Sequence, residues 1–187
     1  MHRYKIFLVI ALLSLLGGCQ TIQVSQDYDV SRNFSALKTY DWQTKTQPKT
    51  GDIRVDNQLL DTRIRTAVDR TLAEKGYQKI AGEKTDFTVS YKYSIRSKLE
   101  SDNVGMGVGF GWGRVGRYGG VGVDTGRYIS EYDEGMIVID LIDAAKGDLI
   151  WRGTGTARVD QHAKPDEITK GVNEAVEKIL SQFPPLP

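Results

Sequence analysis

Apolar residues are patterned as strands along four stretches of the chain. The clearest case begins at Phe87, from which Val89, Tyr91, Tyr93 and Ile95 alternate with polar residues, and this alternation predicts a strand with one buried face. The predicted strands are Phe34–Trp42, Asp86–Ile95, Met136–Ile142 and Leu149–Val159. The last two are separated by a turn at residues 143–148 and are expected to form a hairpin.

Two further segments carry apolar residues every three or four positions, which is the spacing of an amphipathic helix. They are Asp56–Lys75 and Asp166–Gln182. Asp52 or Asp56 is expected to cap the first helix, and Gly76 to end it, because glycine adopts the left-handed conformation freely. Together these elements predict an α+β domain, with two amphipathic helices packed on one face of a mostly antiparallel sheet.

Residues 1–18 have the organisation of a signal peptide. Arg3 and Lys5 give a positively charged start, and Ile6–Leu16 is an almost wholly apolar run. This run is much shorter than the ~20 residues that cross a bilayer. Two glycines follow, and then Cys19. The order of charge, apolar run, small residues and cysteine resembles the bacterial lipobox, which predicts cleavage before Cys19.

The lipobox resemblance implies that the Cys19 thiol carries a diacylglyceryl group. One acyl chain alone holds a protein to a membrane only marginally, whereas two or three make attachment effectively permanent. Residue 20 is glutamine, not the aspartate that marks inner-membrane retention in enteric-type bacteria, so the resemblance implies the periplasmic face of the outer membrane. Residues 19–31 are polar and are predicted to be a lipidated tether. The alternative is an ordinary or uncleaved signal with a chance cysteine.

Composition favours one ordinary domain behind this leader. The chain has 187 residues, of which 40% are hydrophobic and 26% charged, values typical of soluble globular proteins. Residues 32–187 are therefore expected to form a single domain. The formal net charge of +1 argues against nucleic-acid binding, which needs concentrated basic surface. Since Cys19 is the single cysteine, no intramolecular disulfide can form.

Short motifs along the chain occur in an order that resembles a known family. They are Lys38–Trp42 (Lys-Thr-Tyr-Asp-Trp), Gly76–Tyr77, Asp86–Tyr91, Leu149–Gly153 (Leu-Ile-Trp-Arg-Gly) and Ala175–Pro185. Together they resemble the bacterial lipoproteins grouped as "domain of unknown function 4136", over nearly the whole mature chain. The resemblance implies a periplasm-facing lipoprotein with an α+β domain. It implies no catalytic residues, since none is established for that family.

Residues 103–126 form a glycine-rich insert that departs from the family pattern. Half of the chain's 20 glycines lie here, between apolar and aromatic residues. One interpretation is a mobile loop or hairpin extension, because glycine loses more backbone entropy on ordering than other residues. The other is a contact surface for a partner, for lipid or for cell-wall polymer. The possible contact residues are Phe110, Trp112, Arg114, Arg117 and Tyr118.

Two motifs in the insert resemble functional signatures but lack the context that those signatures need. Residues 111–116 match the dinucleotide fingerprint GxGxxG, which works between a strand and a helix, whereas more glycines follow here. Asp124-Thr125-Gly126 resembles the loop of aspartic proteases, whose chemistry requires two such aspartates. Neither motif predicts a cofactor or a catalytic residue.

Outside the insert, a few residues offer candidate chemistry. Glu131–Glu134 is an acidic cluster without the spaced pattern of a calcium loop, so we expect a solvated turn. His162 is expected at the surface, because one histidine cannot make a zinc site alone. Trp42 and Trp151 are expected in the core, and Arg152 on the opposite face of its strand, solvated or binding an anion. No metal site is predicted.

These observations predict a membrane-anchored, periplasm-facing lipoprotein that acts by binding, not by catalysis. Lipid on Cys19 would raise its effective concentration for an envelope protein or cell-wall partner nearby. The alternative is a periplasmic hydrolase acting on cell-wall or lipid material. It would need paired acids in a cleft, or His162 beside a serine. A third interpretation is an assembly role through self-association.

Overall fold

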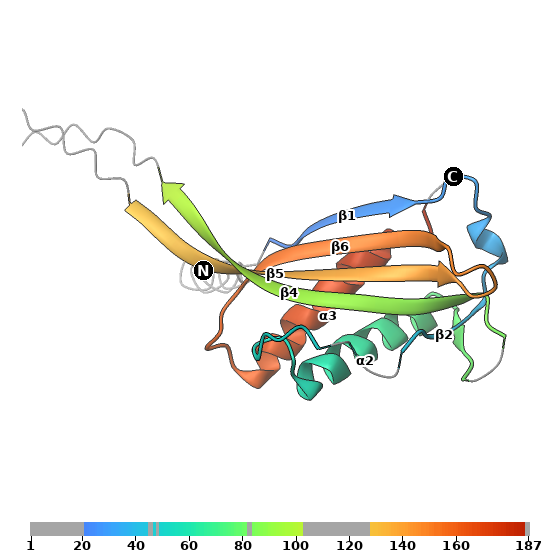
Figure 1. Ribbon diagram of the computed structural model, residues 1–187, viewed down its shortest axis with the longest axis horizontal. Coiled ribbons are helices and arrows are strands. Elements are labelled where there is room, and N and C mark those ends of the chain that lie inside the picture. The colour runs from blue at the N-terminus through green and yellow to red at the C-terminus, as the bar shows by residue number, and fades with distance from the viewer. Residues whose placement is uncertain (1–20, 45–46, 48, 82–83, 103–127, 186–187) are drawn as a thin grey trace, which may run out of the picture.

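The computed structural model describes residues 21–44, 47, 49–81, 84–102 and 128–185. Within these residues a six-stranded sheet is accompanied by two α-helices and a short 3-10 helix (Figure 1). The helices are η1 (Phe34–Ala36), α2 (Gln58–Glu74) and α3 (Pro165–Ser181). The strands are β1 (Gln23–Tyr28), β2 (Thr39–Trp42), β3 (Gln78–Lys79), β4 (Phe87–Asp102), β5 (Tyr128–Asp143) and β6 (Leu149–Val159).

The sheet is mixed, with strand order β1-β6-β5-β4-β2-β3. β1, β6, β5 and β4 pair antiparallel, whereas β2 pairs in parallel with both β4 and β3. The α+β class is confirmed. The prediction of a mostly antiparallel sheet is wrong, because β2 adds two parallel pairings and the sheet is mixed. The chain runs from β2 through α2 before it re-enters the sheet, and parallel strands require a crossover of this kind.

One hydrophobic core joins the sheet to the helices. Phe87, Val89 and Tyr91 of β4 are all buried, as their alternation with polar residues requires. Trp151 of β6 and Phe183, which follows α3, are fully buried. Figure 1 draws α2 and α3 next to each other, and the two helices are in direct contact.

Both predicted helices and three of the predicted strands are confirmed. β6 has the predicted bounds, and α2 and α3 start and end within about two residues of the predicted segments. The cap of α2 differs, because the Asn57 side chain accepts the Leu59 amide at 2.8 Å. Asp56 instead accepts the amides of Thr50 and Gly51. Gly76 has a φ of +87° after the helix, as expected.

Three segments differ from the prediction. Residues 23–28, predicted as part of a tether, instead form β1, because their backbone pairs with β6 although their side chains are mostly exposed. Of the predicted strand Phe34–Trp42, only residues 39–42 form a strand, since the Asn33 side chain caps a 3-10 turn at 34–36. Glu131–Glu134 lies within β5 and pairs with β4, so the predicted turn there is wrong.

Two aspartates fasten β2 to its surroundings. Asp69 of α2 accepts hydrogen bonds from the Tyr40 hydroxyl and from Nε1 of Trp42, both at 3.0 Å, and lies 2.8 Å from Nζ of Lys79. Asp86 accepts hydrogen bonds from the amides of residues 38 and 39 at 2.8 Å and from the Thr39 hydroxyl at 2.9 Å. These contacts tie β2 to α2 and to the start of β4.

Asp86 makes the fold sensitive to acid. Hydrogen bonds from the Lys38 amide, and then from Thr39, hold the pKa of Asp86 below its ordinary value, although partial burial acts to raise it. A depressed pKa in the folded state stabilises the protein above the unfolded value of about 3.9, and this stability is lost as the pH falls through the folded value. We therefore expect the free energy of unfolding to fall progressively from about pH 5 towards pH 2.

Urea unfolding at a series of pH values measures this dependence. The Asp86→Asn variant should be less stable at neutral pH and should show a shallower decline in acid. Part of the decline should remain, because the Lys146 and Ala145 amides and Arg32 also lower the pKa of Asp143. If the free energy of unfolding of Asp86→Asn declined in acid as steeply as that of the natural protein, Asp86 would not be a source of the acid sensitivity.

Candidate functional site

A groove of about 560 Å³ lies between the sheet and the first turns of α2 and α3. Its volume falls within the range of small-molecule sites. Its walls come from β4, β5 and β6, from both helices and from the residue that precedes β1. The apolar wall residues include Ile22, Leu60, Ile95, Ile137, Ile168 and Val172.

Glycines shape the groove in two ways. A Cβ at Gly135 would meet Cγ1 of Val159 at 2.7 Å and the Tyr93 hydroxyl at 3.0 Å, so glycine there makes room for its neighbours. A Cβ at Gly171 of α3 would meet no atom within 4 Å. Gly171 lines the groove, and the side chain that it lacks therefore leaves space in this wall.

Three arginines line the groove, and two of them have carboxylate partners. Arg158 pairs with Glu100 and lies over the Tyr132 ring, and Arg54 pairs with Asp52. Nε of Arg63 donates a hydrogen bond to Oγ1 of Thr169 at 3.0 Å. Among the described residues no carboxylate pairs with Arg63, and its remaining N–H groups are available for other acceptors.

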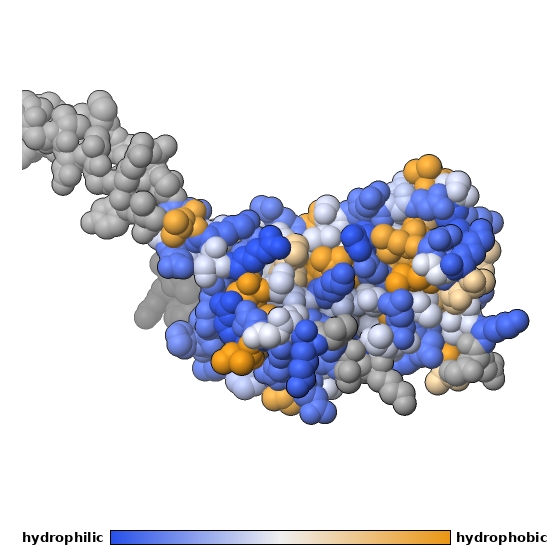
Figure 2. Space-filling model, in the orientation of Figure 1, coloured by the Kyte–Doolittle hydropathy of each residue, from blue (hydrophilic) through white to orange (hydrophobic). Residues whose placement is uncertain are grey.

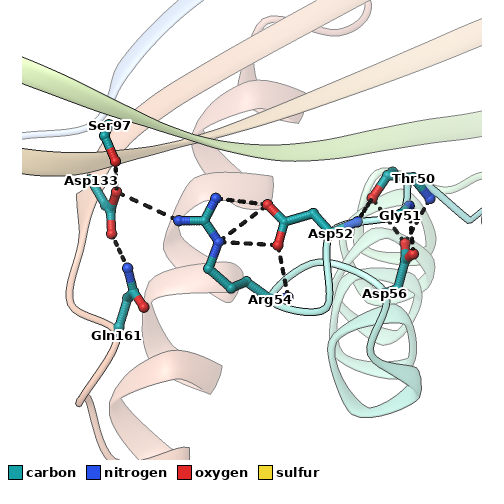
Figure 3. Close-up of polar contacts among 8 residues, drawn as sticks. All are labelled: Thr50, Gly51, Asp52, Arg54, Asp56, Ser97, Asp133 and Gln161. Carbon is teal, nitrogen blue, oxygen red and sulfur yellow. Dashed lines mark hydrogen bonds and ion pairs between the residues drawn. The ribbon is translucent and has the colours of Figure 1, made fainter.

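Arg54 also links the loop before α2 to the sheet (Figure 3). Its Nε and Nη2 bind the Asp52 carboxylate at 3.0 and 2.7 Å, and Nη1 lies 3.7 Å from Asp133 of β5. Asp133 also accepts hydrogen bonds from Gln161 and Ser97, and these bonds lower its pKa. The side chains of Arg54 and Asp52 are 35% and 31% exposed, so this ion pair contributes little stability.

Tyr93 provides a polar atom inside the groove. Its side chain is partly buried, and burial raises the pKa of its hydroxyl. The hydroxyl is therefore neutral at physiological pH and can donate or accept a hydrogen bond. Apart from Tyr93, Thr156 and the charged residues, the sheet side of the groove is apolar or glycine.

The ionisable and nucleophilic side chains of the lining decide which chemistry the groove can support. The described lining residues include no histidine, cysteine or serine. Its two acids, Asp160 and Glu167, accept hydrogen bonds from the amides of His162 and Lys164, respectively. No group of three or more metal-ligating side chains occurs within the described parts of the chain.

A second hollow of about 700 Å³, which is more open, lies on the outer side of α2 and α3. Four of its charged residues are paired. Arg70 binds Glu177 at 2.5 Å, and Lys170 lies 3.8 Å from Glu174. Because this hollow is more open and the groove has more apolar lining residues, we take the groove as the candidate site.

Several of the predicted site residues lie outside the described residues. Among them are Cys19 and the two glycine-rich motifs at 111–116 and 123–126. The possible contact residues Phe110, Trp112, Arg114, Arg117 and Tyr118 also lie there. Lipidation and a contact role for the insert therefore stay predictions.

The structure places the other candidates apart from one another. Trp151 is fully buried, and Trp42 packs at the edge of the core, where Arg65 lies 4.3 Å from its ring centroid. Arg152 binds Asp140 with two hydrogen bonds of 2.6 and 2.7 Å, so this guanidinium is paired with a carboxylate. His162 is exposed in the loop before α3.

Sequence reasoning missed the groove because its residues are spread along the chain from Ile22 to Ala175. One local signal was present. Gly171 lies inside an otherwise regular helical pattern, where glycine is less stable than alanine by about 1 kcal/mol and leaves one position of the helix without a side chain. The spacing of Tyr93 and Arg63 along the chain carries no comparable signal.

Figure 2 shows scattered hydrophobic patches among predominantly hydrophilic residues on one face. Ile53, in the loop that carries Arg54, and Leu59, in the first turn of α2, are 90% and 65% exposed. Across the described residues, no helix has the length and apolar character needed to cross a membrane.

Comparisons with known proteins identify a family and similar folds. The family described as "Domain of unknown function (DUF4136)" matches residues 24–185. No curated protein matches the chain. A PDZ domain protein from Parabacteroides distasonis has a similar fold at 14% identity and a TM-score of 0.55. The match covers 96% of this chain and 40% of that one, so the chain spans less than half of that protein's length.

Two structures of the PelC dodecamer from Paraburkholderia phytofirmans have lower similarity. Their identities are 15% and 16%, and their TM-scores are 0.49 and 0.47. Each match covers 86% of this chain, and 95% or 96% of the PelC chain.

Proposed function

Because the chain belongs to the family described as "Domain of unknown function (DUF4136)", whose description names no activity, we propose a function from the chain's own residues. It is a lipid-anchored, non-catalytic binding protein on the periplasmic face of the bacterial outer membrane. Cys19 carries the lipid, and the groove beneath the sheet holds the ligand. We further propose that α2 and α3 both cover the same face of the sheet.

The observation that carries the proposal is the short distance along the chain between the proposed anchor and the groove. Ile22 is 8% exposed and forms part of the groove wall. Cys19 precedes it by three residues, which span at most about 11 Å when fully extended. An anchor at Cys19 would therefore hold this end of the domain close to the lipid surface. A ligand in the membrane or near it would meet the groove at high effective concentration.

The lining favours binding over the alternative of a periplasmic hydrolase. A hydrolase would need a nucleophile and a base within hydrogen-bond reach, or two converging acids. In the groove, the described residues offer only the two acids Asp160 and Glu167, and backbone amides already bond to both. His162 is exposed in the preceding loop. These features support a binding role.

Intact-mass analysis and membrane fractionation of the natural protein test the anchor. We expect a chain that begins at Cys19, carries acyl groups and fractionates with the outer membrane. The Cys19→Ser variant should lack the acyl mass and the cleavage before residue 19, because the hydroxyl cannot replace the thiol as acceptor.

Gln20→Asp is the matched control for the destination of the protein. It should keep the acyl mass but shift the protein towards the inner membrane. An unmodified Cys19 in the natural protein, or a chain that starts at another residue, would refute the anchor.

A further inference from the structure

We propose that the groove binds one acyl chain of an anionic membrane lipid, with the anionic head group beside Arg63. This inference rests on the proposed binding function and names its ligand class. Three features of the described residues carry it: an apolar interior, the absence of backbone groups that a peptide would require, and the charge at Arg63.

The interior of the groove suits a hydrocarbon chain. Ile95 and Ile137 line it from the sheet, and Val172 lines it from α3. The open space beside Gly171 widens it, because no atom lies within 4 Å of the position where a Cβ would stand. Each methylene that enters such a space from water improves affinity about fourfold.

A peptide segment fits this interior poorly. The sheet wall is formed by β4, β5 and β6. Along the groove β5 pairs with β4 on one side and with β6 on the other, and backbone hydrogen bonds lie in the plane of the sheet, not across the face that lines the groove. The other wall is formed by helices, whose backbone bonds are internal. A buried peptide would therefore leave its own amides without partners, which is costly. An acyl chain has no such groups.

The charge at one side of the groove suits an anionic head group. Arg63 of α2 makes a single side-chain hydrogen bond, to Thr169. Its remaining guanidinium donors match the geometry of a carboxylate or a phosphate. Arg54 and Arg158 already bind carboxylates, which offset their charge, so Arg63 is the arginine of the groove without a carboxylate partner among the described residues.

Photolabelling of the full chain tests this assignment. The protein is placed in phosphatidylcholine vesicles that contain dodecanoate with a diazirine at its methyl end, and the labelled residues are mapped by mass spectrometry. We expect labels on the groove walls, at Tyr93, Ile95, Ile137 or Val172. Labels confined to residues outside the groove would overturn the proposal.

Gly171→Leu and Gly171→Ala form a matched pair. Leucine fills the open space and should reduce labelling by at least about tenfold, whereas alanine should change it by less than about twofold. Both residues favour a helix more than glycine does, and thermal unfolding checks that each variant remains folded. Undiminished labelling of a folded Gly171→Leu protein would overturn the proposal.

Arg63→Gln tests the head group. In the natural protein the carboxylate probe should label the groove about tenfold more strongly than the neutral alcohol of equal length. Arg63→Gln should remove this preference and keep labelling by the alcohol. The same preference in the variant would refute the role of Arg63.

A further comparison separates the membrane lipid from the lipid on Cys19. If the Cys19→Ser protein is labelled and the natural protein is not, the groove holds the chain's own acyl group, and the assignment to a membrane lipid is overturned. Labelling of the groove does not require a lipid on Cys19. The groove proposal can therefore hold even if Cys19 is not lipidated, and the intact mass of the protein shows whether Cys19 carries a lipid.

Discussion

Replacing Trp151 with alanine is expected to lower the free energy of unfolding by about 3–5 kcal/mol. The indole is fully buried at the centre of the core, and its ring centroid lies 5.3 Å from that of Phe183. Its Nε1 donates a hydrogen bond to Oε1 of Gln26 on β1 at 3.0 Å. The substitution therefore opens a cavity between β6 and the end of α3, and it removes a link to the edge strand.

Urea unfolding followed by far-UV circular dichroism measures this loss without relying on tryptophan fluorescence. Leu149→Ala is the matched control, because Leu149 lies on the same strand and is 47% exposed. It should change stability by no more than about 0.5 kcal/mol. A Trp151→Ala protein that loses less than about 1 kcal/mol would show that the indole does not organise the core.

The sequence predicts those elements whose apolar residues face one continuous core. In α2, the buried Leu60, Ile64 and Leu72 are the residues whose spacing predicts the helix. The alternation from Phe87 to Ile95 predicts the central part of β4 for the same reason. The spacing of apolar residues indicates which face of an element is buried. These two elements could be predicted because each of them buries one face.

Elements held mainly by backbone pairing are harder to predict. β1 carries mostly exposed side chains, and its six residues are ordered by pairing with β6. The outer part of β5, which includes Glu131, pairs with β4 although its side chains are polar. In both cases the hydrogen-bond partner is distant along the chain, so no local pattern indicates the strand.

The family motifs occupy positions that hold the fold together. Tyr40 and Trp42 both bind Asp69, and Asp86 fastens the start of β2. Trp151 and Phe183 fill the core. Of the groove residues, Arg63, Tyr93 and Gly171 all lie outside these motifs. Similarity to the family therefore indicates the fold of the chain. It does not indicate the ligand, which has to be inferred from the residues of the groove.

Alanine at Gly153 and alanine at Gly171 are expected to change stability in opposite directions. A Cβ at Gly153 would lie 2.3 Å from Cη2 of Trp151 and 2.5 Å from Cγ2 of Ile179, so packed groups must move. We expect Gly153→Ala to cost about 1–3 kcal/mol. At Gly171 a Cβ meets nothing, and alanine in a helix should add about 0.5–1 kcal/mol.

Urea unfolding of the two variants beside the natural protein tests this difference in sign. A lower free energy of unfolding for Gly153→Ala and a higher one for Gly171→Ala would support both the close packing around Trp151 and the open space in the groove wall. If Gly171→Ala is destabilising as well, α3 has neighbours at that position, and the space assigned to the acyl chain is already filled. Stability measurements on a single glycine therefore bear directly on the ligand site.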